Sequence, residues 1–224
     1  MDKRYSRNVP ALTKDECELL RNKKIAVIGC GGLGGYIVEL MTRIGVGYIR
    51  VVDGDVFDET NLNRQLLSEL SLIGKMKAEA AATRVKRINP DVETEIKPTF
   101  INEQNAAELI FGCDVVLDGL DNIESRKILA IACEKLNIPY IFGAISGWVA
   151  QAAVSMPGDK LIEKLYPEGT ELKDKSVLSF TPALCAAMQT ALCVKFLTGR
   201  PLKSGTLYHF DLLDENFDFI SFEI

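Results

Sequence analysis

The distribution of apolar residues divides the chain into short strand-like runs separated by helical segments. Four mostly apolar runs are typical of buried parallel strands, at residues 25–28, 48–52, 114–117 and 140–142. Residues 92–96 alternate as a half-buried strand does. Helical spacing of apolar positions fills the intervals, at residues 36–44, 75–88, 102–111 and 123–136. This alternation of strand and helix predicts an α/β fold with a mostly parallel sheet and helices on both faces.

Two long segments carry no regular pattern. Residues 54–73 connect a strand to the following helix, and connections of this length in compact domains tend to be functional. Residues 156–178 are rich in Gly, Pro, Lys and Glu, and we expect them to form a mobile crossover loop. Near the N-terminus, by contrast, Thr13 and Glu16 form a capping box, which predicts a helix that ends near Arg21.

The last third of the chain predicts antiparallel strands. A strand at residues 148–155 comes before a strongly apolar helix, in which Pro182 takes the first position and Gly199 marks the end. Residues 207–213 and 217–222 then form a hairpin. We therefore expect the parallel sheet to be extended by antiparallel strands at the C-terminus, within a single domain of residues 1–224.

Composition and charge narrow the class of protein. Hydrophobic residues make up 47% and charged residues 25% of the 224 residues, as in ordinary globular domains. The formal net charge of −5 argues against general binding to nucleic acid, which needs a basic surface. The first residues contain no apolar signal segment, and no uninterrupted apolar run has the ~20 residues of a membrane helix. We therefore expect a cytoplasmic protein with no membrane partner.

The cysteines do not predict a zinc site. The chain has six, none of them in a C-x-x-C pair, and its only histidine is His209. A structural zinc ion needs four closely arranged Cys or His ligands, so we expect no zinc. In a reducing compartment, the thiols are expected to be small buried hydrophobic groups. The six are Cys17, Cys30, Cys113, Cys133, Cys185 and Cys193.

A glycine loop follows the first buried strand. Its sequence, GCGGLG, fits G-x-G-x-x-G through Gly29, Gly31, Gly32 and Gly34, and it stands between a strand and a helix as this motif requires. Such glycines allow close approach of the backbone to phosphate oxygens, and the helix N-terminus adds partial positive charge. Asp53 ends the next strand, where a carboxylate can bind ribose hydroxyls. Alone, these features favour a Rossmann-like fold that binds NAD.

The residues after Asp53 change this interpretation toward ATP. A hydride-transfer enzyme gains little from further cations around a pyrophosphate, whereas cleavage of a triphosphate needs them where negative charge develops. Arg64 offers a bidentate fork, Lys77 a point charge and Asn61 a neutral donor. The same cluster contains Asp55 and Gln65, and we place both in the nucleotide site.

A second cluster closes the strand at residues 114–117. Its sequence, DGLDN, stands where the carboxyl ends of parallel strands line a ligand crevice. Asp121 is a candidate ligand for Mg²⁺, a hard cation that binds one or two carboxylates together with phosphate oxygens. The alternative is that Asp121 or Asn122 caps the next helix. Arg126, one turn further on, is either a phosphate contact or a partner of Asp121.

These motifs together resemble the E1-like adenylyltransferase family of MoeB, ThiF and HesA. The resemblance rests on GCGGLG, DGD, NLNRQ, GKMKA and LDGLDN, with RYSRN at the N-terminus. It extends from about Arg4 to Ala153 and includes the late helix and the final strands. Residues 157–178 fall outside it.

The resemblance implies a function and assigns roles to the matching residues. Family members use MgATP to adenylate the C-terminal glycine carboxylate of a small ubiquitin-like sulfur carrier, such as ThiS or MoaD, and release pyrophosphate. Gly32 would lie under the phosphates, Asp53 on the ribose and Asp121 on magnesium, with Asn61, Arg64 and Lys77 on the phosphates. Arg7 matches an arginine that reaches the ATP of the partner subunit, which implies a homodimer.

The sequence departs from the family pattern in two respects. It lacks the paired C-x-x-C motifs that bind zinc in many members, and it has no cysteine between residue 157 and Cys185. We expect Cys185 to be a core thiol, and therefore adenylation without a covalent step on this chain. Three alternatives remain: an adenylating enzyme for a non-protein carboxylate such as a modified tRNA nucleoside, a non-catalytic E1-like subunit, and an NAD dehydrogenase.

Overall fold

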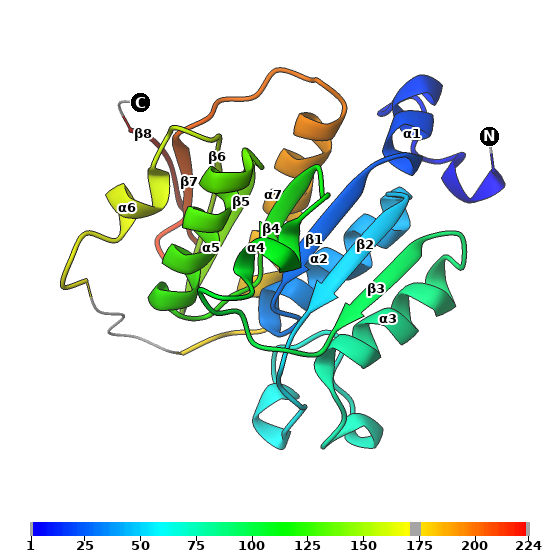
Figure 1. Cartoon of the computed structure of the whole chain (residues 1–224), viewed down its shortest axis with the longest axis horizontal. Coiled ribbons are helices and arrows are strands. Elements are labelled where there is room, and N and C mark those ends of the chain that lie inside the picture. The colour runs from blue at the N-terminus through cyan, green and yellow to red at the C-terminus, as the bar shows by residue number, and fades with distance from the viewer. Residues whose placement is uncertain (1, 171–175, 223–224) are drawn as a thin grey trace.

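Eight strands form one sheet in the computed structural model, which describes residues 2–170 and 176–222 (Figure 1). The strands are β1 (Lys24–Ile28), β2 (Tyr48–Val52), β3 (Glu93–Lys97), β4 (Val115–Asp118), β5 (Tyr140–Ser146), β6 (Val149–Ser155), β7 (Thr206–Asp211) and β8 (Asn216–Ser221). Their order is β3-β2-β1-β4-β5-β6-β7-β8. The first five of these are parallel, and β6, β7 and β8 continue the sheet antiparallel. The predicted sheet, with its antiparallel C-terminal extension, is confirmed.

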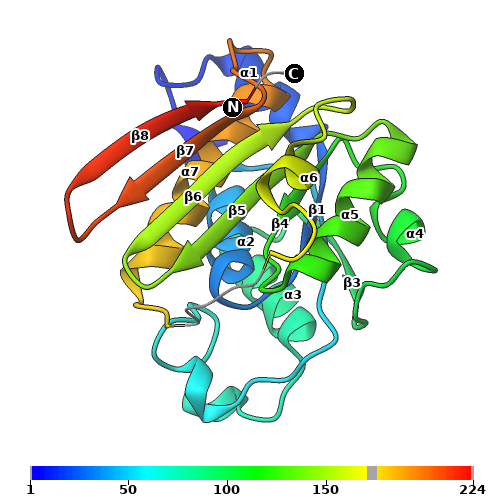
Figure 2. The ribbon, with the colours of Figure 1, turned by 90° about the vertical axis from the view of Figure 1, so that its left-hand side faces the viewer.

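Helices cover both faces of this sheet (Figure 2). They are α1 (Lys14–Arg21), α2 (Gly32–Ile44), α3 (Lys77–Ile88), α4 (Ala106–Ile110), α5 (Ile123–Leu136), α6 (Leu161–Leu165) and α7 (Phe180–Leu197). The apolar residues of α1, α2, α3 and α7 form one buried core with the sheet. Those of α4, α5 and α6 form a second core on the opposite face. The sheet therefore lies between two apolar layers, as the near-continuous hydrophobic strands predict.

Two helices begin earlier than their sequences suggest. The helix predicted from residue 36 begins at Gly32, because the glycines of the loop already form its first turn. The late helix begins at Phe180, so Pro182 is its third residue and the prediction of a first-position proline is wrong. Proline is tolerated there because the first N–H groups of a helix have no partner within the helix.

The segment at residues 156–178 is not a single loop. It contains α6, whose Leu161 and Ile162 are buried in the second core. The prediction of an unstructured crossover is therefore wrong for these residues. Its remaining part includes residues 171–175, which lie outside the described residues. The helix expected at residues 102–111 is shorter, because Asn102 and Asn105 bond one another in a turn before α4 begins.

The N-terminal segment is attached to the fold. Tyr5 is buried, and its hydroxyl accepts a hydrogen bond of 2.6 Å from the amide of Asn89. Its ring lies against Gly45, where an added Cβ would come within 2.4 Å of the ring. Arg4 pairs with Asp91 at 3.0 Å. These contacts hold the segment at the end of α2 that is farther from the glycine loop.

Candidate active site

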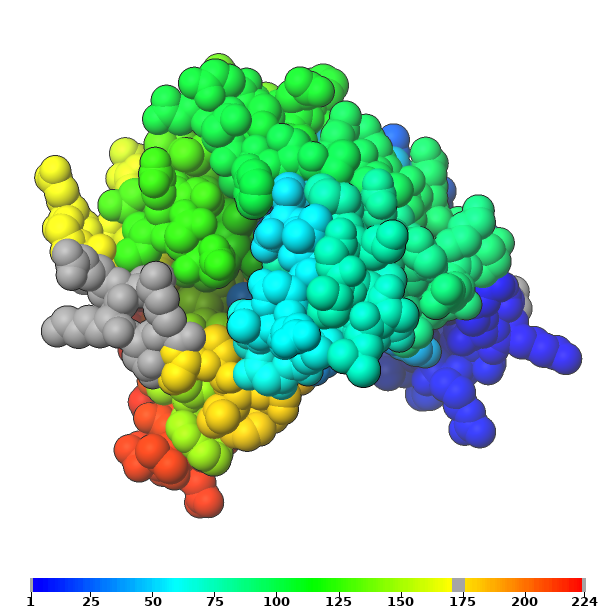
Figure 3. Space-filling view, turned by 90° about the horizontal axis from the view of Figure 1, so that it is seen from below, coloured from blue at the N-terminus to red at the C-terminus, as the bar shows by residue number. Residues whose placement is uncertain are grey.

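The carboxyl ends of β1, β2 and β4 meet at one edge of the sheet and form the floor of a cleft. Ile28 is level with Val52 on one side and with Asp118 on the other, so the three following loops converge. The cleft has a volume of about 850 Å³, within the range of small-ligand sites. Figure 3 views the molecule from this end, with the residues of the 54–73 connection in cyan.

Of the fourteen residues assigned to the site from the sequence, eleven line this cleft. They are Gly29, Gly31, Gly32, Asp53, Asp55, Arg64, Gln65, Lys77, Asp121, Asn122 and Arg126. The other three, Gly34, Asn61 and Arg7, are not among the lining residues.

The glycine loop places backbone N–H groups at the cleft. Gly29 has φ 93°, a left-handed conformation that favours glycine, and Gly32 begins α2. The N-terminus of this 13-residue helix therefore faces the space that the phosphates would occupy. Gly34 packs directly against the start of the loop, since a Cβ there would lie 1.7 Å from the carbonyl oxygen of Gly29.

Asp53 connects β2 to the glycine loop. Its carboxylate accepts hydrogen bonds from the N–H of Cys30 at 2.7 Å and from the N–H of Asp55 at 2.8 Å. Burial raises the pKa of this carboxyl, and the two N–H donors favour its ionised form. Each oxygen keeps acceptor capacity beyond these bonds, so a carboxylate that binds ribose hydroxyls fits this position.

Lys77 lies at the start of α3 with its ammonium group in the cleft. It is only 6% exposed, and its Nζ lies 2.6 Å from a carboxylate oxygen of Asp55. Burial raises the pKa of the Asp55 carboxyl, but the hydrogen bonds from Lys77 and from the N–H of Val56, together with the charge of Lys77, lower this pKa by more, so the net shift is downward. The Asp55 side chain keeps 49% exposure, so this partner is accessible to water while the lysine is not.

The NLNRQ motif contributes Arg64 and Gln65 to the lining of the cleft. Arg64 donates from Nη1 to the carbonyl oxygen of Thr60 at 2.8 Å and to Asn63 at 2.9 Å. Gln65 is buried beside Gly31, and its Oε1 has no hydrogen-bond partner among the described residues. Asn61 is buried and accepts a hydrogen bond of 3.3 Å from the N–H of Asp58, closing a short helical turn. Its side chain thus stabilises the loop that carries Arg64.

The DGLDN segment supplies both a helix cap, Asn122, and an exposed carboxylate, Asp121. Asn122 caps α5 by accepting a hydrogen bond of 2.8 Å from the N–H of Ser125. Asp121 is exposed at the cleft and accepts a hydrogen bond of 3.2 Å from the Asn122 amide. One accessible carboxylate beside a phosphate site is the donor set that Mg²⁺ uses in nucleotide enzymes. Asp121 therefore fits the metal, and the alternative role as cap belongs to Asn122.

Arg126 has a different partner from the one expected. Its Nε lies 3.0 Å from the carboxylate of Asp118, and both side chains are buried. The pairing of Arg126 with Asp121 is therefore wrong. The misassignment arose because Asp118 is the last residue of a buried strand, and the sequence does not show which way its side chain points.

Arg7 is exposed and lies on the N-terminal segment, held near Gly45 at the far end of α2. Arg7 is not among the residues that line the cleft of its own chain, and Figure 1 shows the N-terminal segment beside α1, away from the 54–73 connection. Its assignment therefore depends on a second copy of the chain and stays a prediction.

Several lining residues were missed by the sequence analysis. Thr99, Phe100 and Ile101 follow β3, and Phe100 packs so closely on Gly54 that a Cβ at Gly54 would lie 2.7 Å from it. Val149 and Gln151 reach the cleft from β6. The position of the first three after a parallel strand was the available signal. Gln151 had none, because its strand follows no loop motif.

The cysteines are all buried. Burial raises the pKa of Cys185 to about 12, so its thiol is protonated at neutral pH. Cys30, in the glycine loop, likewise has a pKa raised by burial. Among the described residues, no group of three His, Cys, Asp or Glu side chains is arranged to hold a metal ion.

Helix α7 is long and apolar enough to cross a membrane by length and composition, with a mean hydropathy of 1.4 over 18 residues. However, 56% of that window is buried inside the fold, against α2 and the sheet. Core helices commonly meet the same criteria, so this is weak evidence for a membrane span.

Known proteins are similar to this chain in sequence, and solved structures are similar to it in fold. The SAMP-activating enzyme E1 of Haloferax volcanii is 32% identical over 211 residues, which cover 91% of this chain and 78% of that protein. The sulfur carrier protein adenylyltransferase of Thermus thermophilus is 31% identical over 230 residues, covering 96% and 84%. The crystal structure of E. coli MccB with ATP superposes with a TM-score of 0.83 at 22% identity, covering 99% of this chain and 72% of that one.

Other relatives match over less of their length. The chain spans 53–60% of several probable adenylyltransferases. The tRNA threonylcarbamoyladenosine dehydratase of Haemophilus influenzae is 38% identical over 135 residues, 59% of this chain and 52% of that protein. The ThiF family model matches residues 5–223, nearly the whole chain. The chain therefore belongs to the ThiF family of E1-like adenylyltransferases.

Proposed function

We propose that this chain uses ATP to adenylate the C-terminal glycine carboxylate of a small ubiquitin-like sulfur carrier of the ThiS or MoaD type. The observation that carries the proposal is Lys77, a buried lysine that lines the same cleft as the glycine loop and Arg64. A cleft that only held a dinucleotide would not need a desolvated ammonium group there. The names of the relatives from Thermus thermophilus and Haloferax volcanii support the same class of reaction.

The reaction needs no general base. A C-terminal carboxylate is already ionised at neutral pH, so its oxygen attacks the α-phosphorus directly. One P–O bond forms to the carboxylate while the bond to pyrophosphate breaks, and the product is an acyl adenylate. The residues of the chain act by positioning and by charge. Asp53 holds the ribose, and the N–H groups around Gly32 hold phosphate oxygens.

Lys77 and Arg64 stabilise the negative charge that develops on the leaving pyrophosphate. Lys77 donates to Asp55 in the structure, and this accessible carboxylate can be exchanged for a phosphate oxygen. Asp121 would hold Mg²⁺, which would supply positive charge to stabilise the phosphates. Gln65 is buried beside Gly31, and its Oε1, which has no hydrogen-bond partner among the described residues, is an acceptor next to the glycine loop.

ATP–pyrophosphate exchange tests the proposal. The chain is mixed with purified carriers that end in Gly-Gly, and exchange is expected only with an intact C-terminal carboxylate. A carrier that lacks its final glycine is the matched control. Absence of exchange with any ThiS- or MoaD-like carrier would overturn the proposal and favour a non-catalytic binding subunit.

A second candidate acceptor is a carboxylate on a modified tRNA nucleoside. It is favoured by the 38% identity to the Haemophilus influenzae dehydratase, although that match covers 59% of the chain. The net charge of −5 disfavours binding to RNA. Exchange that depends on added tRNA instead of a carrier protein would establish this second candidate.

We also propose a homodimer in which Arg7 acts on the ATP of the partner subunit. The exposed position of Arg7, outside the cleft of its own chain, supports a role in trans. Mixing inactive Arg7→Ala and Asp121→Ala subunits should restore part of the exchange activity, because one of the two cleft types is then complete. A monomer by sedimentation under active conditions would contradict this arrangement.

A further inference from the structure

Asp118 and Arg126 form a buried ion pair, and both side chains make further hydrogen bonds. The Asp118 carboxylate accepts from Arg126 Nε at 3.0 Å, from the Tyr140 hydroxyl at 2.6 Å and from the N–H of Leu120 at 2.8 Å. Arg126 Nη2 donates to the carbonyl oxygens of Leu120 at 2.7 Å and Gly143 at 2.9 Å. Burial lowers the pKa of Arg126, but Asp118, Tyr166 and Tyr140 together raise this pKa by more, so the guanidinium stays charged.

These bonds fix the backbone that leads to Asp121. Both the N–H and the carbonyl oxygen of Leu120 are bound by the pair, one by each member. The carbonyl oxygen of Asp118 accepts a further hydrogen bond of 2.8 Å from the Gln189 amide of α7. Asp121 therefore follows a backbone segment that is held by hydrogen bonds at Asp118 and at Leu120.

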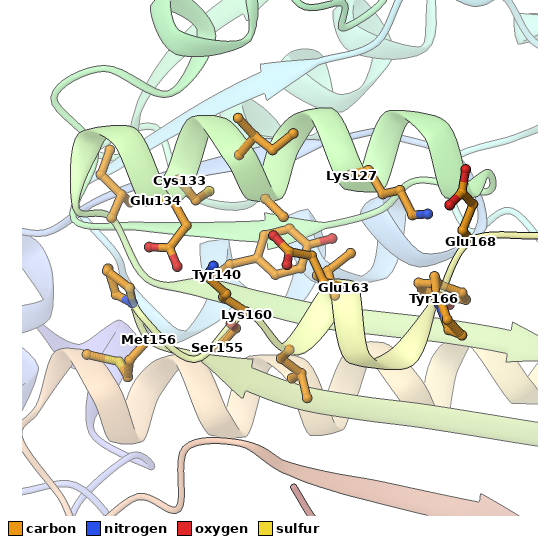
Figure 4. Close-up of a pocket in the computed structure, with 17 residues that line it drawn as sticks. Lys127, Cys133, Glu134, Tyr140, Ser155, Met156, Lys160, Glu163, Tyr166 and Glu168 are labelled. Carbon is orange, nitrogen blue, oxygen red and sulfur yellow. The ribbon is translucent and has the colours of Figure 1, made fainter. Parts of the chain in front are cut away.

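A second cavity lies on the other side of the pair. This side pocket has a volume of about 450 Å³ and is enclosed by α5, α6 and the adjoining ends of β5 and β6 (Figure 4). Tyr140 and Tyr166 line it, and Tyr166 lines the nucleotide cleft as well. The Tyr166 hydroxyl accepts a hydrogen bond of 3.2 Å from Arg126 Nη1, and its ring lies 5.8 Å from the guanidinium carbon.

Tyr166 comes directly after α6 and is the residue that joins this helix to the cleft. It is 8% exposed, and its ring also packs edge-on against Phe142 at 6.0 Å. Among the described residues, the Arg126 guanidinium donates hydrogen bonds to Asp118, Leu120, Gly143 and Tyr166, and only Tyr166 lies beyond β6 in the chain. The seating of α6 is thereby coupled to the orientation of Arg126.

We propose that Tyr166 is a positioning residue for adenylyl transfer, acting through Arg126 and Asp118 on the segment that carries Asp121. The inference rests on the proposed function, in which Asp121 holds Mg²⁺ near the phosphates. Removal of the Tyr166 hydroxyl leaves Arg126 Nη1 without its protein acceptor in a buried site, and the guanidinium turns toward another one. Leu120 and Asp121 then shift with it, while the glycine loop and Asp53 keep their places.

The test compares Tyr166→Phe with Tyr48→Phe. Tyr48 lies at the opposite end of β2 from the cleft, and its hydroxyl also bonds a charged partner, Glu95. In pyrophosphate exchange, Tyr166→Phe should lower kcat about tenfold, since hydrogen bonds to charged groups contribute that much or more. Its KM for ATP should change by less than about twofold. Tyr48→Phe should leave both unchanged.

Calorimetry provides a readout that does not depend on turnover. The affinity for ATP is measured at increasing concentrations of Mg²⁺. Tyr166→Phe should need a several-fold higher Mg²⁺ concentration than the wild type for the same increase in ATP affinity. Tyr140→Phe, which removes a donor to Asp118, should shift this dependence in the same direction. Rescue of Tyr166→Phe turnover by higher Mg²⁺ would further support positioning.

Two outcomes separate the proposals. If wild type and variants show the same dependence of ATP affinity on Mg²⁺, and kcat of Tyr166→Phe equals that of Tyr48→Phe, Tyr166 has only a structural role and the inference is overturned. If the wild type itself shows no exchange with any carrier, the proposed function fails instead. Calorimetry still decides the role of Tyr166 in that case.

Discussion

Two ion pairs lie at the nucleotide cleft, one of them lining it with both residues and the other through Arg126 alone, and they differ in how freely their partners can be exchanged. Lys77 and Asp55 are 2.6 Å apart, with the lysine buried and the carboxylate half exposed. Arg126 and Asp118 are 3.0 Å apart, and both are buried among further hydrogen bonds. The first pair can open toward a phosphate without leaving a buried charge alone, whereas the second cannot.

This difference indicates which of the two basic residues, Lys77 or Arg126, can bind an anionic substrate. A buried pair whose remaining donors and acceptors are all satisfied contributes rigidity, and loss of one partner is severe. A buried cation whose anion faces water keeps a charge available for an incoming anion. By this criterion, Lys77 is the residue that we propose as the nucleotide contact, and Arg126 is the one that we propose to position the segment beside it.

The largest effect should come from breaking the enclosed pair. Arg126→Ala leaves Asp118 buried without its counter-charge, and the free energy of unfolding should fall by about 3–5 kcal/mol. Urea unfolding followed by circular dichroism measures it. As a control, Arg43→Ala removes the 56% exposed partner of Glu39 and should cost less than about 1 kcal/mol. Equal losses of stability in Arg126→Ala and Arg43→Ala would show that the enclosed pair is no more important to the fold than an exposed one.

Breaking the open pair should affect the reaction more than the fold. Lys77→Ala should reduce exchange by about 10²–10³-fold, equivalent to about 2.7–4 kcal/mol in the activation free energy. Its free energy of unfolding should change much less than that of Arg126→Ala. Asp55→Asn is the informative companion, since it removes the resting partner and keeps the cation. It should retain most of the activity, and a loss as large as that of Lys77→Ala would show that Asp55 itself acts in the reaction.

The smallest effect concerns a third cluster, at the far end of β2. Tyr48 and Arg50 both bind Glu95, and the hydrogen bond from Tyr48, followed by that from Arg50, lowers the pKa of Glu95 to about 2 from 4.5. A lowered pKa stabilises the fold above pH 4.5, and this contribution disappears as the pH falls from 4.5 toward 2. Glu95→Gln should therefore show a shallower loss of stability than the wild type over this interval. Thermal unfolding at several pH values measures the difference, and identical profiles would contradict the assigned pKa.

The sequence was sufficient for the architecture because the signals were local. Buried parallel strands have uninterrupted apolar runs, and the capping box of Thr13 and Glu16 is present with both of its hydrogen bonds. The glycine loop was also placed correctly, since its spacing depends only on neighbouring residues. Lys77 could be assigned to the cleft because it follows β2 through a single connection.

Contacts between distant segments were the part that the sequence could not show. Arg126 bonds Tyr166, 40 residues away, and Asp118 bonds Tyr140, 22 residues away. Neither tyrosine belongs to a motif, and their directions depend on how β5 and α6 pack. Helix α6 itself was hidden because a five-residue helix carries too few turns for a periodic pattern. Its stability comes from burial of Leu161 and Ile162 rather than from local propensity.

The glycines of the cleft also determine how two of its loops pack. A Cβ at Gly29 would lie 2.5 Å from the carbonyl oxygen of Gly119, and one at Gly119 would lie 2.4 Å from that of Gly29. The loops after β1 and β4 are thus in direct backbone contact, with no side chain between them to act as a spacer or a hinge. The glycine loop and the segment before Asp121 are therefore packed against one another as one unit. The remaining lining of the cleft includes Arg64 and Gln65 of the 54–73 connection and residues 99–101, none of which takes part in this glycine contact.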